Sequence, residues 1–299
     1  MQVSYLSNDV ISRYCPEIHF HSKERYLPCD PDDYIQNANI FDSSLNIQND
    51  INFLNNDTTN LTLKLKDSVR KSFLYGNENL TEVPVFVVYK RLVDSEDRFL
   101  SYEINYFLFF PHNSGGIFNI GSHEGDWEHI TVRIDNSFKL QGVYYSNHRS
   151  YEGEWISNGE IPMNKDGRIV AYCAKGSHGF WSSPGYHWRI FGFGNDYTND
   201  NGIRWVPSTI KVIINVNDYD IQQQIVPKNI DVSNAYLLKV NDESPDVVKD
   251  LSHWQLYSGN WGEIHSYRNN GWFGGHEDVR SITPIQRFLN IKPLIKNKV

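Results

Sequence analysis

The residues of this chain best suited to chemistry lie in the segment 121–129, GSHEGDWEH. If this segment forms a strand, its side chains alternate between two faces, so Asp126 and Glu128 point the same way. His123 comes just before them, where a glycine-flanked turn would fold its imidazole back towards both carboxylates. Two carboxylates and one imidazole favour Mg²⁺, Mn²⁺ or Ca²⁺ over Zn²⁺, which usually takes more nitrogen or sulfur ligands. The spacing therefore predicts a divalent-cation site made of His123, Asp126 and Glu128.

Two other interpretations of the same carboxylates remain open. Buried like charges repel, so the pKa of one carboxyl group rises unless a cation or a proton intervenes. One alternative is therefore a protonated network, or one paired with Lys or Arg, that holds no metal. The other is ordinary surface charge, because most carboxylates are solvated.

A second polar segment, residues 174–181 (AKGSHGFW), follows a candidate strand. Gly176 and Gly179 permit a tight turn that presents Lys175 and His178, and we expect both side chains to line a polar pocket. In a hydrolase, Glu128 or His178 would take a proton from a metal-bound water, and Lys175 would stabilise the developing negative charge. The alternative for His178 is a hydrogen-bonded residue of the core.

The elements that position these residues follow the two-residue period of β-strands. Residues 82–93 (EVPVFVVYKRLV) are apolar on both faces, which predicts a strand buried on both sides. Glycine, asparagine and aspartate turns separate further expected strands at 101–110, 126–134, 140–146, 168–174 and 210–216. Short helices are expected at 67–73, 246–251 and 283–289. The pattern predicts an all-β fold: a two-sheet antiparallel β-sandwich with long loops and a few short helices, forming a single domain over residues 1–299.

Composition excludes several classes of protein. With 39% hydrophobic and 14% aromatic residues, the 299-residue chain has enough apolar side chains for a packed core. A net charge of -8 argues against a nucleic-acid partner, and no apolar run approaches the roughly 20 residues of a membrane-spanning helix. The first 13 residues lack the apolar core of a signal peptide, so an intracellular location is the default expectation and the compartment stays unknown.

Five segments carry a resemblance to a known family: PEIHFHSKERYLPCD, YFLFFPHN, IGSHEGDWEHITVRI, AYCAKGSHGFW and YSGNWGE. They occur in the order seen in the vacuolar-protein-sorting-62-like family and extend from about Pro16 to Glu263. The chain therefore resembles that family along most of its length. The family's biochemical activity is unsettled, so the resemblance implies more about fold than about function.

A more local resemblance is to the necrosis-inducing cytolysins, whose GHxHDWE-type motif binds a divalent cation in a β-sandwich. His123, Asp126 and Glu128 match that spacing, whereas Glu124 and Gly125 depart from the pattern. An additional upstream acidic ligand of those cytolysins has no clear counterpart in this chain. Because they recognise sugar headgroups of membrane lipids, the resemblance implies a glycan or a lipid headgroup as ligand, by analogy of fold.

Three functions are consistent with these observations. The first is a binding protein whose solvent-open cation holds a polar small molecule, a glycan, a lipid headgroup or a phosphate at the edge of a sheet. The second is a metal-assisted hydrolase that uses His178, Lys175 and Glu128. The third is a structural or self-assembling protein whose polar cluster only holds the sandwich together.

Overall fold

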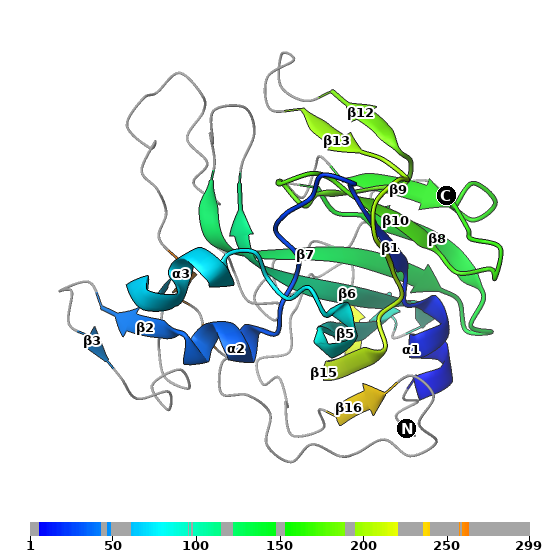
Figure 1. Cartoon of the computed structure of the whole chain (residues 1–299). Helices are drawn as coiled ribbons and strands as arrows, with labels where there is room; N and C mark the ends of the chain where they lie inside the picture. The colour runs from blue at the N-terminus through cyan, green and yellow to red at the C-terminus, as the bar shows by residue number, and fades with distance from the viewer. Residues whose placement is uncertain are drawn as a thin grey trace.

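The computed structural model describes residues 6–42, 47–48, 61–94, 96, 98–114, 122–147, 153–188, 195–220, 236–239, 257 and 259–262. Strands dominate this part of the chain (Figure 1). The strands are β1 (Glu17–Phe20), β2 (Ala38–Phe41), β3 (Ile47–Gln48), β4 (Thr62–Leu65), β5 (Pro84–Val93), β6 (Phe99–Asn113), β7 (His123–Ile134), β8 (Leu140–Tyr145), β9 (Glu154–Ser157), β10 (Val170–Cys173), β11 (Phe180–Trp181), β12 (Gly185–His187), β13 (Asp196–Thr198), β14 (Arg204–Trp205), β15 (Thr209–Asp220), β16 (Tyr236–Lys239) and β17 (Asn260–Trp261). The helices are α1 (Asn8–Tyr14), α2 (Pro31–Gln36), α3 (Asp67–Phe73) and the 3-10 turn η2 (Leu80–Glu82).

A seven-stranded sheet in the order β16-β15-β5-β6-β7-β8-β9 forms the middle of the molecule. Its longest antiparallel pairing joins β6 to β7, from Tyr102 opposite Ile134 to Asn113 opposite His123. The adjacent β5 residues Val87 and Val88 are both fully buried although they face opposite sides of the sheet. The predicted double burial of residues 82–93 is therefore confirmed.

Each face of this central sheet is covered by a smaller four-stranded sheet. The sheet β11-β10-β1-β14 and helix α1 pack on one face, in a core that includes Ile18, Ala171 and Phe180. The sheet β17-β4-β2-β3 and helix α2 pack on the other face, where Trp127 and Trp261 lie in one cluster. Burying one such large side chain contributes about 2–3 kcal/mol to folding, so apolar residues on both faces stabilise three layers.

The predicted all-β class and the face-to-face packing of sheets are confirmed, and the structure adds a third layer. It also contains parallel pairs, β1 with β10, β5 with β15 and β4 with β17, beside the expected antiparallel ones. The helix expected at 67–73 is α3. The helices expected at 246–251 and 283–289 lie outside the described residues.

Two local features differ from the sequence-based expectations. Strand β6 continues through Pro111 instead of ending at residue 110. Its pairing with β7 goes from Phe110 opposite Asp126 to His112 opposite Glu124, and Pro111 is left across from Gly125. Gly125 has a φ of 66°, so the ladder is irregular at the point where proline has no N–H to donate. Helix α2 was not predicted, although Asp30 caps it by accepting a hydrogen bond from the Asp32 N–H.

Strands β12 and β13 form a two-stranded ribbon apart from the three layers, and Figure 1 shows it projecting from the body. Within the described residues, no helix is long and apolar enough to cross a membrane.

Candidate functional site

The acidic residues of the 121–129 segment lie near the beginning of β7. Asp126 pairs with Phe110 and Glu128 with Leu108, and both of these β6 residues belong to the core beneath β1 and β10. Trp127 belongs to the core on the opposite face. The prediction that Asp126 and Glu128 share a face is therefore confirmed, and both are 4% exposed.

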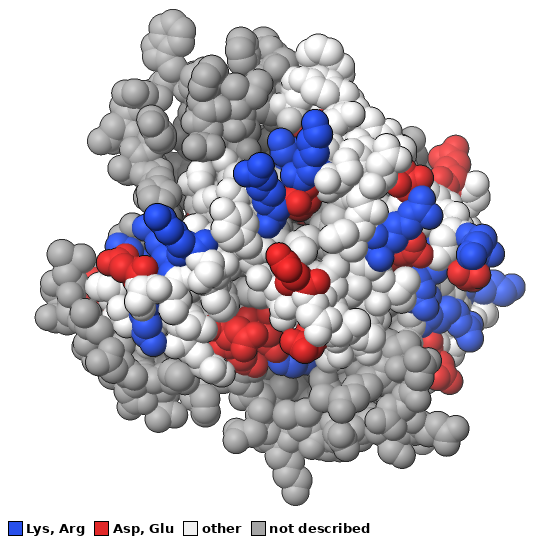
Figure 2. All heavy atoms as spheres, in the orientation of Figure 1, with Lys and Arg blue, Asp and Glu red and all other residues white. Residues whose placement is uncertain are grey.

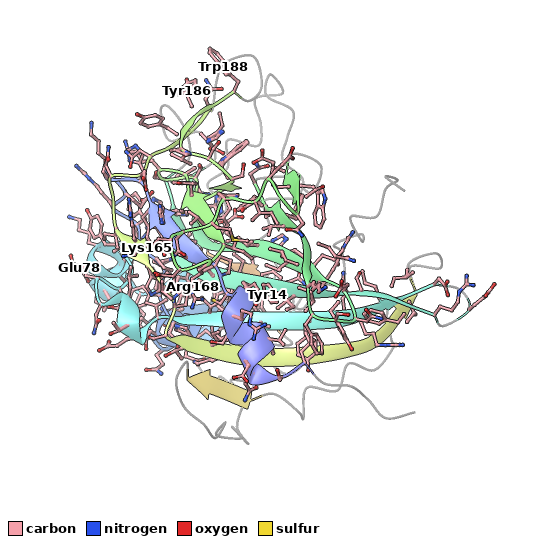
Figure 3. The ribbon with its side chains drawn as sticks, turned by 90° about the vertical axis from the view of Figure 1, so that its right-hand side faces the viewer. Tyr14, Glu78, Lys165, Arg168, Tyr186 and Trp188 are labelled. Atoms are coloured by element: carbon pink, nitrogen blue, oxygen red, sulfur yellow. The ribbon has the colours of Figure 1, made fainter. Side chains whose placement is uncertain are left out.

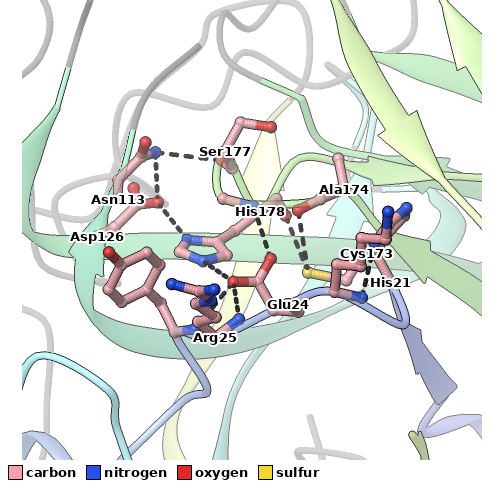
Figure 4. A network of polar contacts seen from close by, with 12 residues as sticks. His21, Glu24, Arg25, Asn113, Asp126, Cys173, Ala174, Ser177 and His178 are labelled. Atoms are coloured by element: carbon pink, nitrogen blue, oxygen red, sulfur yellow. Dashed lines mark hydrogen bonds and ion pairs between the residues drawn. The ribbon is translucent and has the colours of Figure 1, made fainter. Parts of the chain in front are cut away.

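His178 reaches this face from the turn that follows β10. The backbone of His178 is in the left-handed region, with a φ of 61°, which is strained for a residue other than glycine. Its ring stacks on Phe110 at 3.9 Å between centroids and with 6° between planes. This packing places Nδ1 3.2 Å from Asp126 Oδ2 and Nε2 3.9 Å from Glu24 Oε1, so the imidazole lies between two carboxylates (Figure 4).

The two carboxylates keep the imidazole of His178 protonated. Burial alone would lower the pKa of His178, but the hydrogen bonds and charges of Asp126 and Glu24 outweigh it and raise the pKa to about 9. Burial would likewise raise the pKa of Asp126, but hydrogen bonds from His123 and His178 hold it well below its usual range. At neutral pH the positive charge between the acids is therefore an imidazolium, whose Nδ1 donates to Asp126 and whose Nε2 faces Glu24 at 3.9 Å.

Glu24 ties the loop after β1 to the turn that carries His178. One carboxylate oxygen accepts the backbone N–H groups of Arg25 and Tyr26 at 2.8 and 2.9 Å. The other accepts the N–H of Gly176 at 2.6 Å. Burial opposes ionisation of Glu24, yet His178 and these backbone donors lower its pKa. The carboxylate therefore fixes the path of two loops at once.

Asn113 completes the network from the end of β6. Its Nδ2 donates to Asp126 Oδ2 at 2.9 Å and to the Ser177 carbonyl at 3.1 Å. Sequence reasoning missed both Glu24 and Asn113 as members of this cluster. Asn113 could have been found from the sequence, because pairing the strand YFLFFPHN against DWEH places it next to the acidic segment. Glu24 could not, because the turn whose Gly176 N–H it accepts is 152 positions away.

The residues predicted to bind a cation are only partly brought together. His123 Nε2 lies 3.5 Å from Asp126 Oδ1, and Glu128 is buried on the same face. The described part of the chain contains no group of three or more His, Cys, Asp or Glu side chains arranged to hold a metal ion. Asp126 Oδ2 already accepts hydrogen bonds from His178 and Asn113, so these residues do not fit a cation at that oxygen. The divalent cation stays a prediction that this geometry does not support.

The residues predicted to be catalytic differ in their exposure to solvent: His178 and Glu128 are buried and Lys175 is exposed. His178 is fully buried and protonated at neutral pH, so it is not available there as a general base. Lys175, three residues earlier, is exposed. The structure therefore does not place these two side chains together in one solvent-open pocket.

A cavity of about 460 Å³ opens on the outer side of the Glu24 loop. Its lining consists of Glu24, Arg25, Leu27, Tyr75, Glu78 and Ile203. Tyr75 is 49% exposed, and the ring of Tyr26 stacks on it at 5.7 Å with only 3° between planes. Arg25 and Glu78 are exposed, and neither side chain forms a hydrogen bond or ion pair within the described residues. The cavity therefore offers an aromatic face beside two available charged groups of opposite sign.

Comparison with known proteins identifies relatives. The family model described as vacuolar protein sorting-associated protein 62 matches residues 2–268. The putative vacuolar protein sorting-associated protein TDA6 of Saccharomyces cerevisiae is 26% identical over 251 residues, which cover 66% of this chain and 52% of the yeast protein. The chain thus spans about half the length of that relative.

Two solved structures are similar at a low level. One is the Necrosis and Ethylene inducing Protein 2 from the causal agent of cocoa's Witches Broom disease, with a TM-score of 0.33, 13% identity, and coverage of 72% of this chain and 77% of that one. The other is NLPPya in complex with glucosamine, with a TM-score of 0.33, 14% identity, and coverage of 61% and 71%. The family match, which spans nearly the whole chain, carries the assignment: this chain belongs to the vacuolar protein sorting-associated protein 62 family.

Proposed function

We propose that this protein is a binding protein that takes a sugar unit, free or as part of a headgroup, in the cavity at Tyr75. The observation that carries the proposal is the half-exposed Tyr75 ring beside the available Arg25 and Glu78 side chains on a cavity of about 460 Å³. Sugar rings have apolar C–H faces that pack on aromatic rings, and their hydroxyls bond to carboxylates and guanidinium groups. The volume lies within the range of small-molecule sites.

The charges on the cavity favour an uncharged ligand. Arg25 and Glu78 have opposite signs, and the Glu24 carboxylate is compensated by His178, so these groups together attract neither an anion nor a cation strongly. A hydroxyl-rich ring satisfies both, because a hydroxyl donates to Glu78 and another accepts from Arg25. Leu27 and Ile203 supply the apolar remainder of the wall. An uncharged sugar therefore matches this cavity better than a phosphate does.

The buried network gives the cavity its shape. Glu24 fixes the backbone of Arg25 and Tyr26, and Tyr26 in turn stacks on Tyr75. His178 favours the charged form of the Glu24 carboxylate, and Asp126 holds His178 through its Nδ1. In this proposal His178 is a positioning residue that keeps a binding loop in place, because its ring is too deeply buried to touch the ligand.

The test is calorimetric titration of the full chain with a panel of neutral monosaccharides and oligosaccharides. Tyr75→Ala removes the stacking face, so we expect affinity for the bound sugar to fall by about three- to tenfold. Tyr75→Phe keeps the ring and retains most of the affinity. Tyr186→Ala is the matched control, because Tyr186 is 52% exposed and lies on β12, well away from Glu78 in Figure 3.

The proposal fails if the wild-type chain binds none of these sugars. It also fails if Tyr75→Ala and Tyr186→Ala reduce binding equally, because the ligand would then not lie on the Tyr75 ring.

A further inference from the structure

The ribbon formed by β12 and β13 turns its aromatic side chains outward. Tyr186 pairs with Tyr197 across the ribbon, and Trp188 follows two positions after Tyr186 on the same side. Tyr186, Tyr197 and Trp188 are 52%, 48% and 76% exposed. The Tyr186 ring lies 5.3 Å from that of Trp188 and 6.3 Å from that of Tyr197. These three residues form one continuous exposed surface, here named the aromatic platform.

The opposite face of the ribbon is polar, and it is the face that packs on the body. Asp196 and Thr198 are 2% and 1% exposed. Asp196 accepts hydrogen bonds from Ser177 Oγ at 2.6 Å and Trp181 Nε1 at 3.1 Å, and the His187 ring stacks on Trp181 at 3.9 Å. A solvent-facing ribbon usually buries its apolar side and exposes its polar side. This ribbon does the reverse, so its outward aromatic residues indicate a partner surface.

The position of the platform limits the shape of that partner. Figure 1 shows the ribbon projecting from the layered body, and Figure 3 shows Tyr186 and Trp188 at one extremity of the molecule. A platform that projects in this way can meet a broad, flat partner surface.

Exposed lysines lie next to the platform. The Lys175 N–H donates to the Tyr197 carbonyl at 3.0 Å. The Lys23 N–H donates to His21 Nδ1 at 3.0 Å, and the His21 ring lies 4.8 Å from that of Tyr197. Both lysine side chains are exposed, and neither ammonium forms a hydrogen bond or ion pair with another described residue. Figure 2 shows exposed Lys and Arg side chains, with Asp and Glu side chains among them, on the face that it draws.

We propose that the aromatic platform, together with Lys23 and Lys175, docks this protein on the surface of an anionic lipid bilayer. Tryptophan and tyrosine rings are amphipathic and settle at the headgroup level of a bilayer, with the ring in the apolar boundary and its N–H or O–H hydrated. Lysines beside them gain electrostatic attraction from anionic headgroups. The combination of a convex aromatic surface with adjacent cations matches a bilayer surface in both shape and charge.

The test is co-sedimentation of the full chain with phosphatidylcholine vesicles that either contain or lack phosphatidylserine. We expect the wild type to pellet with the phosphatidylserine vesicles and much less with phosphatidylcholine alone. Lys23→Gln with Lys175→Gln lowers the phosphatidylserine-dependent partition by about fivefold per lysine at low salt. Lys165→Gln is the matched control, because Lys165 is exposed and lies away from the platform in Figure 3.

The aromatic contribution is tested by Tyr186→Ala with Trp188→Ala, which we expect to abolish sedimentation with both kinds of vesicle. Circular dichroism of the variant must match that of the wild type, and Trp188→Phe, which keeps an apolar ring, retains partial binding. Tyr75→Ala changes the sugar cavity and leaves vesicle binding intact, so the two proposals fail separately. If the wild type stays in the supernatant with both vesicles, or if the double alanine variant sediments as the wild type does, bilayer docking is refuted.

Discussion

Replacing Asp126 by asparagine tests the claim that an imidazolium compensates the buried acids. Asparagine keeps the size of the side chain and still accepts a hydrogen bond from His178 Nδ1, but it carries no charge. His178 then keeps only Glu24, whose oxygen lies 3.9 Å from Nε2, compared with 3.2 Å between Nδ1 and Asp126. The pKa of His178 should therefore fall towards the value that burial alone favours.

The magnitude follows from the pKa of His178. Raising it from 6.5 to about 9 corresponds to about 3 kcal/mol of stabilisation. This contribution is fully present below pH 6.5 and is lost as the pH rises through about 9, because the unfolded histidine releases its proton first. Asp126 is the nearer of the two acids, so its replacement should remove more than half of that stabilisation, or about 2 kcal/mol near pH 6.

The assay is urea unfolding of the wild type and Asp126→Asn at a series of pH values from about 6 to about 10. The wild type should lose about 3 kcal/mol of unfolding free energy over this range, and the variant clearly less. Asp166→Asn makes the same chemical change at an exposed position and should follow the wild-type curve. If the curves of the wild type and Asp126→Asn run parallel, His178 is not held protonated by Asp126 and the account of the network is wrong.

Two further predictions concern the same region. Gly125→Ala places a Cβ 2.6 Å from the Cβ of Trp261 at a φ of 66°, so we expect the unfolding free energy measured by urea titration to fall by about 3 kcal/mol or more. The control Gly167→Ala has a φ of 75° and no atom within 4 Å of the added Cβ, so it should lose only about 1–2 kcal/mol. Equal losses in the two variants would contradict the close packing of Gly125 on Trp261. Because His178 already compensates Asp126, we expect EDTA to leave the melting temperature of protein purified without chelators unchanged. A fall in melting temperature that Mg²⁺, Mn²⁺ or Ca²⁺ reverses would instead support the predicted cation at His123, Asp126 and Glu128.

The two-residue period predicted most of the central sheet, because a strand buried on both faces has a pattern that few other elements share. Residues 82–93 and 126–134 were recognised in this way, and so was the shared face of Asp126 and Glu128. The third layer was not predicted, because its short strands pair with partners far along the chain and local pattern does not encode pairing. Strand β1, for example, pairs with β10 through the register Glu17–Val170.

The candidate site shows the same limit in chemical terms. Sequence spacing placed two acids on one face and left three explanations open: a metal ion, a protonated or Lys- or Arg-paired network, or ordinary surface charge. In the structure both acids are buried, and the tertiary fold brings His178 to Asp126 and Glu24. The cavity at Tyr75 was not predicted, because its lining comes from three separate segments around Glu24, Tyr75 and Ile203.

The pairing of β1 with β10 has a consequence for biosynthesis. Glu24 and Gly176 are 152 positions apart, so a chain emerging from the ribosome completes its first loop long before the turn that anchors it exists. Until then the edges of β1 remain open to other strands, which slows folding and exposes the nascent chain to aggregation. Translation that stalls before residue 170 should therefore yield a species that chaperones retain.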